Sequence, residues 1–295
     1  MRNIVLVFSL TLLSFFHVTA SPQSDATARS WNQPVKPYRI INNVWYVGAS
    51  GVTSFLITTS KGHILLDSGL PETVPQIKKN VARLGFKLSD IKILLNSHAH
   101  YDHAGGLAEL KEMTGAKLIA TEADAELLAR GGKGDFQWND QYAYKPVKTD
   151  LTLRDGDQVK LGEVTLTARL TPGHTKGSTT WTMKLKDGGK QYNVVFASSI
   201  STPGYNLVDN DKYPNIVDDY RRTFQILKSL PCDVFLGPHA EFFSMKEKMK
   251  RLEQRAEPNP FIDPAGYRAY LAGGEKDFQK IVETQTQERK KGEGK

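Results

Sequence analysis

The 295-residue chain contains a single cysteine, Cys232, and this scarcity excludes several kinds of protein. One thiol cannot form an internal disulfide, and it cannot build a zinc site from several thiolates. Cys232 lies just before the apolar run 234–236, so we expect it to be a buried structural thiol. The fold must therefore depend on a hydrophobic core, for which the hydrophobic content of 39% is sufficient.

The chain also lacks an apolar run long enough to span a membrane, which takes about 20 residues. The nearest candidate is the apolar stretch 4–16, which follows Arg2 and precedes the small residues 18–20. This pattern is typical of a secretory signal peptide over residues 1–20. A membrane anchor is the alternative, and the short apolar length disfavours it. We therefore expect export to a bacterial periplasm, with no membrane contact after cleavage.

Two further patterns are missing. The net charge is +7, but the basic residues are scattered, and no basic stripe alternates with aromatic residues. We therefore expect no nucleic-acid partner. A histidine-rich low-complexity tract, which a zinc-buffering protein would carry, is also missing from the sequence. These absences favour a discrete site for a small molecule on a protein that we expect to be monomeric.

Hydrophobic periodicity predicts one domain over residues 21–295, with two sets of strands that are each followed by helices. This order favours an α/β fold in which two packed sheets carry helices on their outer faces. Residues 21–36 are polar, so we expect an arm with little structure, and the charged tail 288–295 is expected to fray. Asp263 is a plausible N-cap of the last helix. The expected strands are 38–41, 44–47, 54–58, 63–66, 91–95, 117–120, 164–170, 178–185, 192–197 and 233–236, and the expected helices are 74–84, 104–114, 122–130, 216–230 and one from 264.

Residues 131–144 form a long segment without periodicity, in which glycines precede aromatic residues. Loops of this length are usually functional or disordered. The composition predicts a substrate-facing flap. A surface excursion with self-packed aromatic rings is an equally good interpretation from the sequence alone.

The histidines follow a pattern. Of the seven, His17 belongs to the expected signal peptide, and His63 lies inside a strand and is interpreted as structural. The other five lie on polar turns next to strand ends: His98, His100, His103, His174 and His239. Asp102 stands among the first three. Imidazole and carboxylate are ligands that suit zinc, and six ligands are enough for two ions with three protein ligands each. Catalytic zinc typically keeps an open position, where it lowers the pKa of water to roughly 7.

The motif His98-x-His100-x-Asp102-His103, with His174 and His239, resembles the metallo-β-lactamase superfamily, and the resemblance extends from about Tyr38 to the last helix. It implies a four-layer αβ/βα sandwich. Glyoxalase II and many related hydrolases carry a bridging aspartate at the end of the strand 192–197, and two β-lactamase subclasses carry a cysteine there. This chain has Ser199, which makes it similar to subclass B3.

The resemblance implies a role for each site residue. His98, His100 and His174 would hold the first Zn²⁺, and Asp102, His103 and His239 the second. Ser199 and Ser201 would bind a substrate carboxylate, Tyr205 would donate a hydrogen bond near the oxyanion, and Asp102 would also orient the hydroxide. Asp67 would support the metal-binding loop, or else it is a strand-end turn cap. Some members link the position of Cys232 to a cysteine in the last helix. Here Tyr267 falls near that partner position, so the bridge is missing.

The sequence thus predicts a zinc-dependent hydrolase that opens the amide bond of β-lactam antibiotics, namely penicillins, cephalosporins or carbapenems, by zinc-bound hydroxide. Such an activity would confer antibiotic resistance. Another hydrolase of the same superfamily, a lactonase or a thioesterase, is the alternative, and the missing bridging aspartate disfavours it. A zinc-binding protein without catalysis is a more distant alternative.

Overall fold

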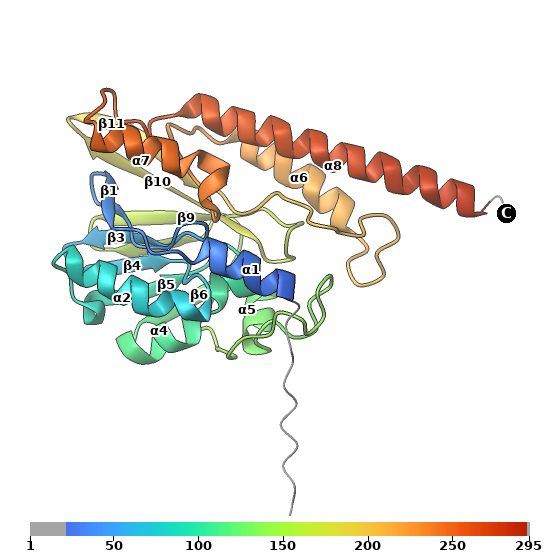
Figure 1. Ribbon diagram of the computed structural model, residues 1–295, viewed down its shortest axis with the longest axis horizontal. Coiled ribbons are helices and arrows are strands. Elements are labelled where there is room, and N and C mark those ends of the chain that lie inside the picture. The colour runs from blue at the N-terminus through green and yellow to red at the C-terminus, as the bar shows by residue number, and fades with distance from the viewer. Residues whose placement is uncertain (1–21, 294–295) are drawn as a thin grey trace, which may run out of the picture.

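Two mixed β-sheets face each other, and helices cover their outer faces (Figure 1). The computed structural model describes residues 22–293, so the expected signal peptide lies outside the described residues. The first sheet has seven strands in the order β1-β2-β3-β4-β5-β6-β7. Pairing is antiparallel from β1 to β4 and parallel from β4 to β7. The bounds are β1 Tyr38–Ile41, β2 Val44–Tyr46, β3 Phe55–Thr59, β4 Gly62–Leu66, β5 Ile91–Leu95, β6 Lys117–Thr121 and β7 Leu151–Leu153.

The second sheet has five strands in the order β12-β11-β10-β9-β8. Its pairing is antiparallel except between β11 and β12, which are parallel. The bounds are β8 Gln158–Leu161, β9 Val164–Leu170, β10 Thr179–Asp187, β11 Lys190–Phe196 and β12 Val234–Leu236. The short strands β7 and β8 are additions to those expected from the sequence, because three or four residues carry too little periodicity to be recognised.

Helices complete the two outer layers. Three of them, α2 (Val74–Arg83), α4 (Leu107–Thr114) and α5 (Glu122–Ala129), pack apolar side chains against the outer face of the first sheet. The second sheet is covered by α6 (Ile216–Ser229), α7 (Met245–Glu253) and α8 (Pro264–Glu293). The remaining pieces are α1 (Pro22–Trp31), α3 (Tyr101–Ala104) and the 3₁₀ turns η1 (Pro71–Thr73), η2 (Leu88–Asp90) and η3 (Ala240–Phe243). The predicted four-layer αβ/βα sandwich is confirmed.

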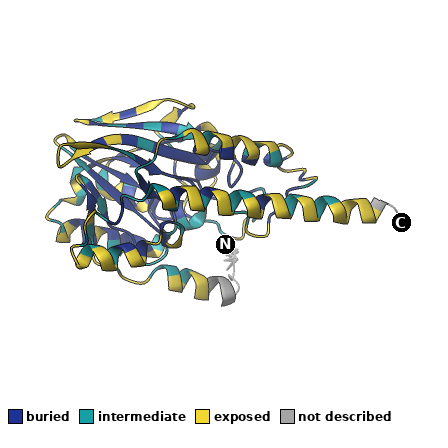
Figure 2. Cartoon of the chain, turned by 90° about the horizontal axis from the view of Figure 1, so that it is seen from above, coloured by how far each residue is buried: buried dark blue, intermediate teal, exposed yellow. Residues whose placement is uncertain are grey.

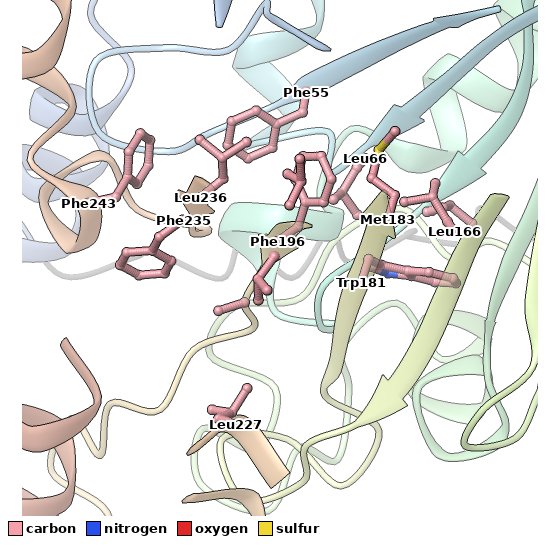
Figure 3. Close-up of a cluster of buried hydrophobic side chains, with 14 of the residues drawn as sticks. Phe55, Leu66, Leu166, Trp181, Met183, Phe196, Leu227, Phe235, Leu236 and Phe243 are labelled. Atoms are coloured by element: carbon pink, nitrogen blue, oxygen red, sulfur yellow. The ribbon is translucent and has the colours of Figure 1, made fainter. Parts of the chain in front are cut away.

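Side chains alternate between two apolar cores along the first sheet, as the two-residue period of a strand requires. In β4, Ile64 and Leu66 belong to the core between the sheets, and Leu65 belongs to the core under the helices. Figure 3 shows the inner core, where Phe55 of the first sheet meets Phe196 of the second at a ring distance of 5.4 Å. Both sheets are thereby held in one hydrophobic unit.

Both ends of the chain differ from expectation. Residues Pro22–Trp31 form the helix α1, where the sequence predicted an arm with little structure. Helix α8 continues to Glu293, through most of the tail that was expected to fray, and its end projects beyond the body of the molecule (Figure 2). Neither Pro22–Trp31 nor the tail of α8 has a strong apolar period, so the sequence does not predict a helix in these two segments. Asp263 does cap α8, because its Oδ1 accepts a hydrogen bond from the backbone N of Gly266 at 2.8 Å.

Cys232 is half-buried and unpaired, and burial raises the pKa of its thiol to about 12. Tyr267, near which the resemblance placed the missing partner of Cys232, lies in α8. Its ring is buried 5.3 Å from that of Phe235, and its hydroxyl donates to the carbonyl of Leu227 at 2.9 Å. Ring packing and this hydrogen bond fix Tyr267 against the second sheet and α6. Within residues 22–293, no helix is both long and apolar enough to cross a membrane.

Candidate metal centre

Three strand ends bring the six expected ligand residues together. His98 and His100 lie in the loop after β5, and Asp102 and His103 lie on α3, which follows directly. The remaining two come from the second sheet: His174 stands between β9 and β10, and His239 stands directly after β12. The six side chains therefore meet at the ends of strands from both sheets, although they come from distant parts of the sequence.

The first group contains His98, His100 and His174. One nitrogen of each ring lies within 4.8 Å of the other two. Nδ1 of His100 lies 3.2 Å from Nε2 of His174, and the rings of His98 and His174 are nearly perpendicular, at 88°. Three ring nitrogens that converge at such distances form the donor set of a three-histidine site.

The second group contains Asp102, His103 and His239. Oδ2 of Asp102 lies 3.1 Å from Nε2 of His103 and 3.3 Å from Nε2 of His239. The two Nε2 atoms lie 3.3 Å apart. A ring nitrogen of His98 also lies within 4.8 Å of a ligand atom of Asp102 and of His103. The two groups therefore adjoin. One solvent molecule or substrate atom can therefore be in reach of both.

Burial and neighbouring charges shift the pKa values of these side chains toward the protonation states that bind a metal. Burial lowers the pKa of His98, His103 and His174, so their imidazoles are neutral at pH 7. Burial alone would raise the pKa of Asp102, but His103 and His239 beside it hold this pKa well below its ordinary value. Neutral imidazole and ionised carboxylate are the forms that bind metal.

The donor set fits a metal ion. Nδ1 of His174 donates to the carbonyl of Ser201 at 2.8 Å, which leaves Nε2 with its lone pair facing the group. Nδ1 of His98 contacts Oγ of Ser97 at 3.1 Å, whereas its buried Nε2 has no hydrogen-bond partner among the described residues. A buried polar atom without a partner is costly. A cation shared by these nitrogens would relieve that cost.

Asp67 supports the metal-binding loop, one of the two roles that the sequence left open. Its Oδ1 accepts a hydrogen bond from the backbone N of Ser97 at 2.6 Å, and its Oδ2 accepts one from Oγ of Ser97 at 2.8 Å. Oδ2 also lies 3.8 Å from Nδ1 of His103. Asp67 adopts a positive φ of 61° in the turn after β4, which brings its carboxylate under the loop. Burial raises its pKa to about 7, against the two hydrogen bonds from Ser97.

The structure places the expected substrate-binding residues differently. Ser201 lines the cavity beside the ligands. Ser199 is buried behind it, with its Oγ 2.9 Å from Oγ of Ser201. Tyr205 corrects an expectation, because its side chain is 1% exposed and its hydroxyl donates to the carbonyl of His174 at 2.8 Å. It is therefore placed to hold His174 and not to reach an oxyanion.

The sequence did not predict two acidic residues that lie near the ligands, Asp135 and Asp124. Oδ2 of Asp135 lies 3.5 Å from Nε2 of His100, and Oδ1 accepts hydrogen bonds from the backbone N of Gln137 and of Trp138, both at 2.8 Å. Asp124 is buried under the site, where burial raises its pKa to about 6. No ligand-like spacing marks either residue, since each meets the site only through the fold.

The segment 131–144 is a structured wall. Phe136 packs against Tyr205 at a ring distance of 5.2 Å, and Nε2 of Gln137 donates to the carbonyl of Gly204 at 3.0 Å. Trp138 and Tyr142 line the same cavity as the ligand residues. The segment thus combines both sequence interpretations, because its aromatic rings pack on the body and also face the site.

A cavity of about 670 Å³ opens over the ligands. Its walls combine His100, Asp102, His174 and His239 with Trp31 and Phe242. This volume and the mixture of apolar walls with few polar groups are typical of a small-molecule site. Together, the αβ/βα sandwich, the two adjoining ligand groups and the cavity define the chain as a metal-binding sandwich protein with an open site.

The family follows from the sequence match. The model of the metallo-beta-lactamase superfamily matches residues 47–239, and the chain belongs to that superfamily. Among curated proteins, the chain is 30% identical over 163 residues to a hydroxyacylglutathione hydrolase of Bradyrhizobium sp., covering 55% of this chain and 52% of that protein. It is 26% identical over 207 residues to the human acyl-coenzyme A thioesterase MBLAC2, covering 60% and 68%. The chain thus spans about half the length of that hydroxyacylglutathione hydrolase.

Solved structures match over more of their length. The FEZ-1 metallo-beta-lactamase from Legionella gormanii is 45% identical with a TM-score of 0.84, covering 86% of this chain and 98% of that chain. BJP-1, a subclass B3 metallo-beta-lactamase of Bradyrhizobium japonicum, is 44% identical with a TM-score of 0.82, covering 87% and 97%. LRA-12, a class B3 di-zinc metallo-beta-lactamase from an Alaskan soil metagenome, is 38% identical with a TM-score of 0.80, covering 84% and 94%. The expected similarity to subclass B3 is confirmed.

Proposed function

We propose that the protein hydrolyses the amide bond of β-lactam antibiotics with two zinc ions, and that this activity confers resistance. The observation that carries the proposal is the pair of adjoining ligand groups with Ser199, and no acid, at the end of β11. The high identity to β-lactamases over nearly their whole length supports it.

Two zinc ions held by these groups would supply hydroxide near neutral pH and Lewis acids for the carbonyl oxygen and the leaving nitrogen. The protein's own side chains do the rest. Asp102 is ionised and reaches both groups, so it can orient the attacking oxygen and accept a hydrogen bond from it. The Ser201 hydroxyl in the cavity wall can donate to a substrate carboxylate. The aromatic walls, which include Trp138 and Phe242, exclude water from the substrate.

A second candidate is thioester hydrolysis, because the curated relatives include a hydroxyacylglutathione hydrolase and an acyl-coenzyme A thioesterase. The position at the end of β11 argues against it. Ser199 is buried there and pairs with Ser201, and a neutral hydroxyl cannot bridge two cations as a carboxylate does.

The test is hydrolysis of a penicillin, a cephalosporin and a carbapenem by the purified protein, with zinc counted in the same sample. We expect two zinc ions per chain and hydrolysis that a chelator abolishes and zinc restores. A glutathione thioester and an acyl-homoserine lactone serve as parallel substrates. Two bound zinc ions without β-lactam hydrolysis would refute the proposed substrate class, and faster thioester hydrolysis would favour the second candidate.

We also propose that the protein is exported to the periplasm after cleavage near residue 20, on the evidence of its N-terminal sequence pattern. Cell fractionation and N-terminal sequencing of the mature protein test this. Recovery of an intact N-terminus from the cytoplasm would refute it.

A further inference from the structure

The N-terminal segment reaches the cavity, although it lies outside the residues 47–239 that match the family model. Thr27, Ala28 and Trp31 of α1 form part of the cavity wall. Helix α1 runs across the front of the molecule beside the ends of the sheets (Figure 1). A segment that the sequence suggested to be an unstructured arm is thus part of the site.

Hydrogen bonds fix this segment to the loop after β2. The backbone N of Gly51 donates to the carbonyl of Trp31 at 2.8 Å, and the backbone N of Ser50 donates to the carbonyl of Gln33 at 3.0 Å. Oγ of Ser50 donates to the carbonyl of Trp31 at 3.0 Å. The Trp31 side chain lies so close to Gly51 that a Cβ added there would be 2.5 Å from its Cδ1. The indole is therefore held in one place.

The same loop is bonded to the segment that carries His239. The carbonyl of Gly51 accepts a hydrogen bond from the backbone N of Ala240 at 2.9 Å. Val52 and His239 form an isolated antiparallel β-bridge. Residues 50–53 therefore connect Trp31 rigidly to the backbone of a metal-ligand candidate.

His239 differs from the other ligand histidines in how its ring is held. Each of the other four has a polar group of the protein near its second ring nitrogen: Ser97 at 3.1 Å from His98, Asp135 at 3.5 Å from His100, Asp67 at 3.8 Å from His103 and Ser201 at 2.8 Å from His174. Within residues 22–293, we find no hydrogen bond to Nδ1 of His239. Its ring instead contacts Trp31 at a centroid distance of 5.0 Å and Phe242 at 5.1 Å.

We propose that Trp31 is a positioning residue for the second ligand group. Its indole limits rotation of the His239 imidazole and keeps Nε2 directed at Asp102 and His103. The ring contact supplies the orientation that a hydrogen-bonding contact supplies for His98 and His174, and that a facing carboxylate supplies for His100 and His103. This inference rests on the proposed two-metal site, and it makes the N-terminal helix a component of that site.

The test is stepwise zinc binding to the metal-free protein, followed by calorimetry, for wild type, Trp31→Ala and Trp31→Phe. We expect Trp31→Ala to weaken the second zinc about tenfold or more and to leave the first unchanged. Trp31→Phe, which keeps a ring on His239, should restore most of the affinity. If Trp31→Ala does not fold, Trp31→Leu replaces it, with the same expectation.

Trp45→Ala is the matched control. Trp45 is also a half-buried tryptophan, but it lies in β2 and packs on Phe86, which follows α2, away from the ligands. We expect Trp45→Ala to bind both zinc ions with wild-type affinity. A Trp31→Ala protein that binds both ions as tightly as wild type, even with a changed KM, would show that Trp31 is only a substrate wall. Equal weakening of both ions would also overturn the inference.

The same titration separates this inference from the proposed function. A wild-type protein that binds fewer than two zinc ions would refute the two-metal site and this inference with it. A wild-type protein with two zinc ions and no β-lactam hydrolysis would refute the substrate class alone, and the Trp31 result would still decide the positioning role.

Discussion

His103 is the ligand candidate for which the chain offers no substitute. Its Nε2 lies 3.1 Å from Oδ2 of Asp102, and its side chain is completely buried. Ser199 cannot replace His103 as a ligand, because a serine hydroxyl is a poor zinc ligand. The first group contains no atom of His103. We therefore expect the proposed second metal position to depend on His103 and the first to be independent of it.

His103→Ala should lower the zinc content from about two ions per chain to about one. The measurement is metal analysis after dialysis against a fixed low free zinc concentration. His63→Ala is the control, because His63 is also buried but lies in β4 and packs against Phe86, which follows α2. Loss of both zinc ions in His103→Ala would contradict the division of the six ligands.

Asp135 connects the aromatic segment 131–144 to the first ligand group through its contact with His100. Its Oδ2 faces His100, while its Oδ1 holds the local turn through two backbone N–H groups. Asp135→Asn retains an oxygen for the turn and replaces the charge that faces the imidazole. We expect the first zinc to bind about tenfold more weakly, because partners of this kind raise ligand basicity and fix ring orientation.

The control for this prediction lies in the same segment. Oδ1 of the exposed Asp140 accepts a hydrogen bond from the backbone N of Gly134 at 2.9 Å but has no contact with a ligand. Asp140→Asn should leave zinc binding unchanged in the same competition titration with a chromophoric chelator. If Asp135→Asn also behaves as wild type, its carboxylate serves the turn alone.

At the scale of elements, the turn after β9 aims His174. Gly173 has a φ of +134°, and a Cβ added there would lie 2.8 Å from the ring of Tyr220. Gly237, before His239, has no such constraint, since its nearest contact to an added Cβ is 3.5 Å. Close approach of the backbone to a neighbouring side chain therefore requires glycine at position 173 and not at position 237.

Gly173→Ala should lower the free energy of unfolding of the metal-free protein by about 1–3 kcal/mol, because alanine is strained at this φ. Gly237→Ala should cost less than about 1 kcal/mol. Urea unfolding of the two variants side by side measures the difference. Equal stability losses would show that the turn tolerates a side chain and does not need glycine.

At the scale of the whole molecule, the ligand groups connect the two sheets. Each group combines side chains that follow β5 of the first sheet with one that follows β9 or β12 of the second. Ions bound there would join the halves of the sandwich in the folded state, and an unfolded chain would not hold them. Binding to the folded state alone raises stability with ligand concentration.

Metal removal should therefore lower Tm. At free zinc about 1,000-fold above Kd, each bound ion contributes roughly 4 kcal/mol, which corresponds to a Tm shift on the order of 10 °C for each ion. Scanning calorimetry with chelator, and again after zinc is restored, measures the shift. A variant with both His98→Ala and His239→Ala should show no shift, and a chelator effect that persists in it would indicate metal bound elsewhere.

The sequence by itself determined the main strands, the layered fold and the residue types of the metal site. These features are local. Strand periodicity is contained within a few residues, and four of the six ligand candidates lie in the short motif 98–103. His174 and His239 could be recognised because each stands in a glycine- and proline-containing turn next to a strand, a signal that requires no knowledge of contacts.

Only the tertiary structure decided which groups hold those ligands in place. Asp135 meets His100, Asp67 meets Ser97, and Trp31 meets His239. These contacts join segments that are distant in sequence, and an isolated acid or tryptophan carries no mark of the ring that it will face. The physical reason is that ligand chemistry belongs to the side chain, whereas ligand orientation arises from packing and hydrogen bonds that exist only once both sheets have come together.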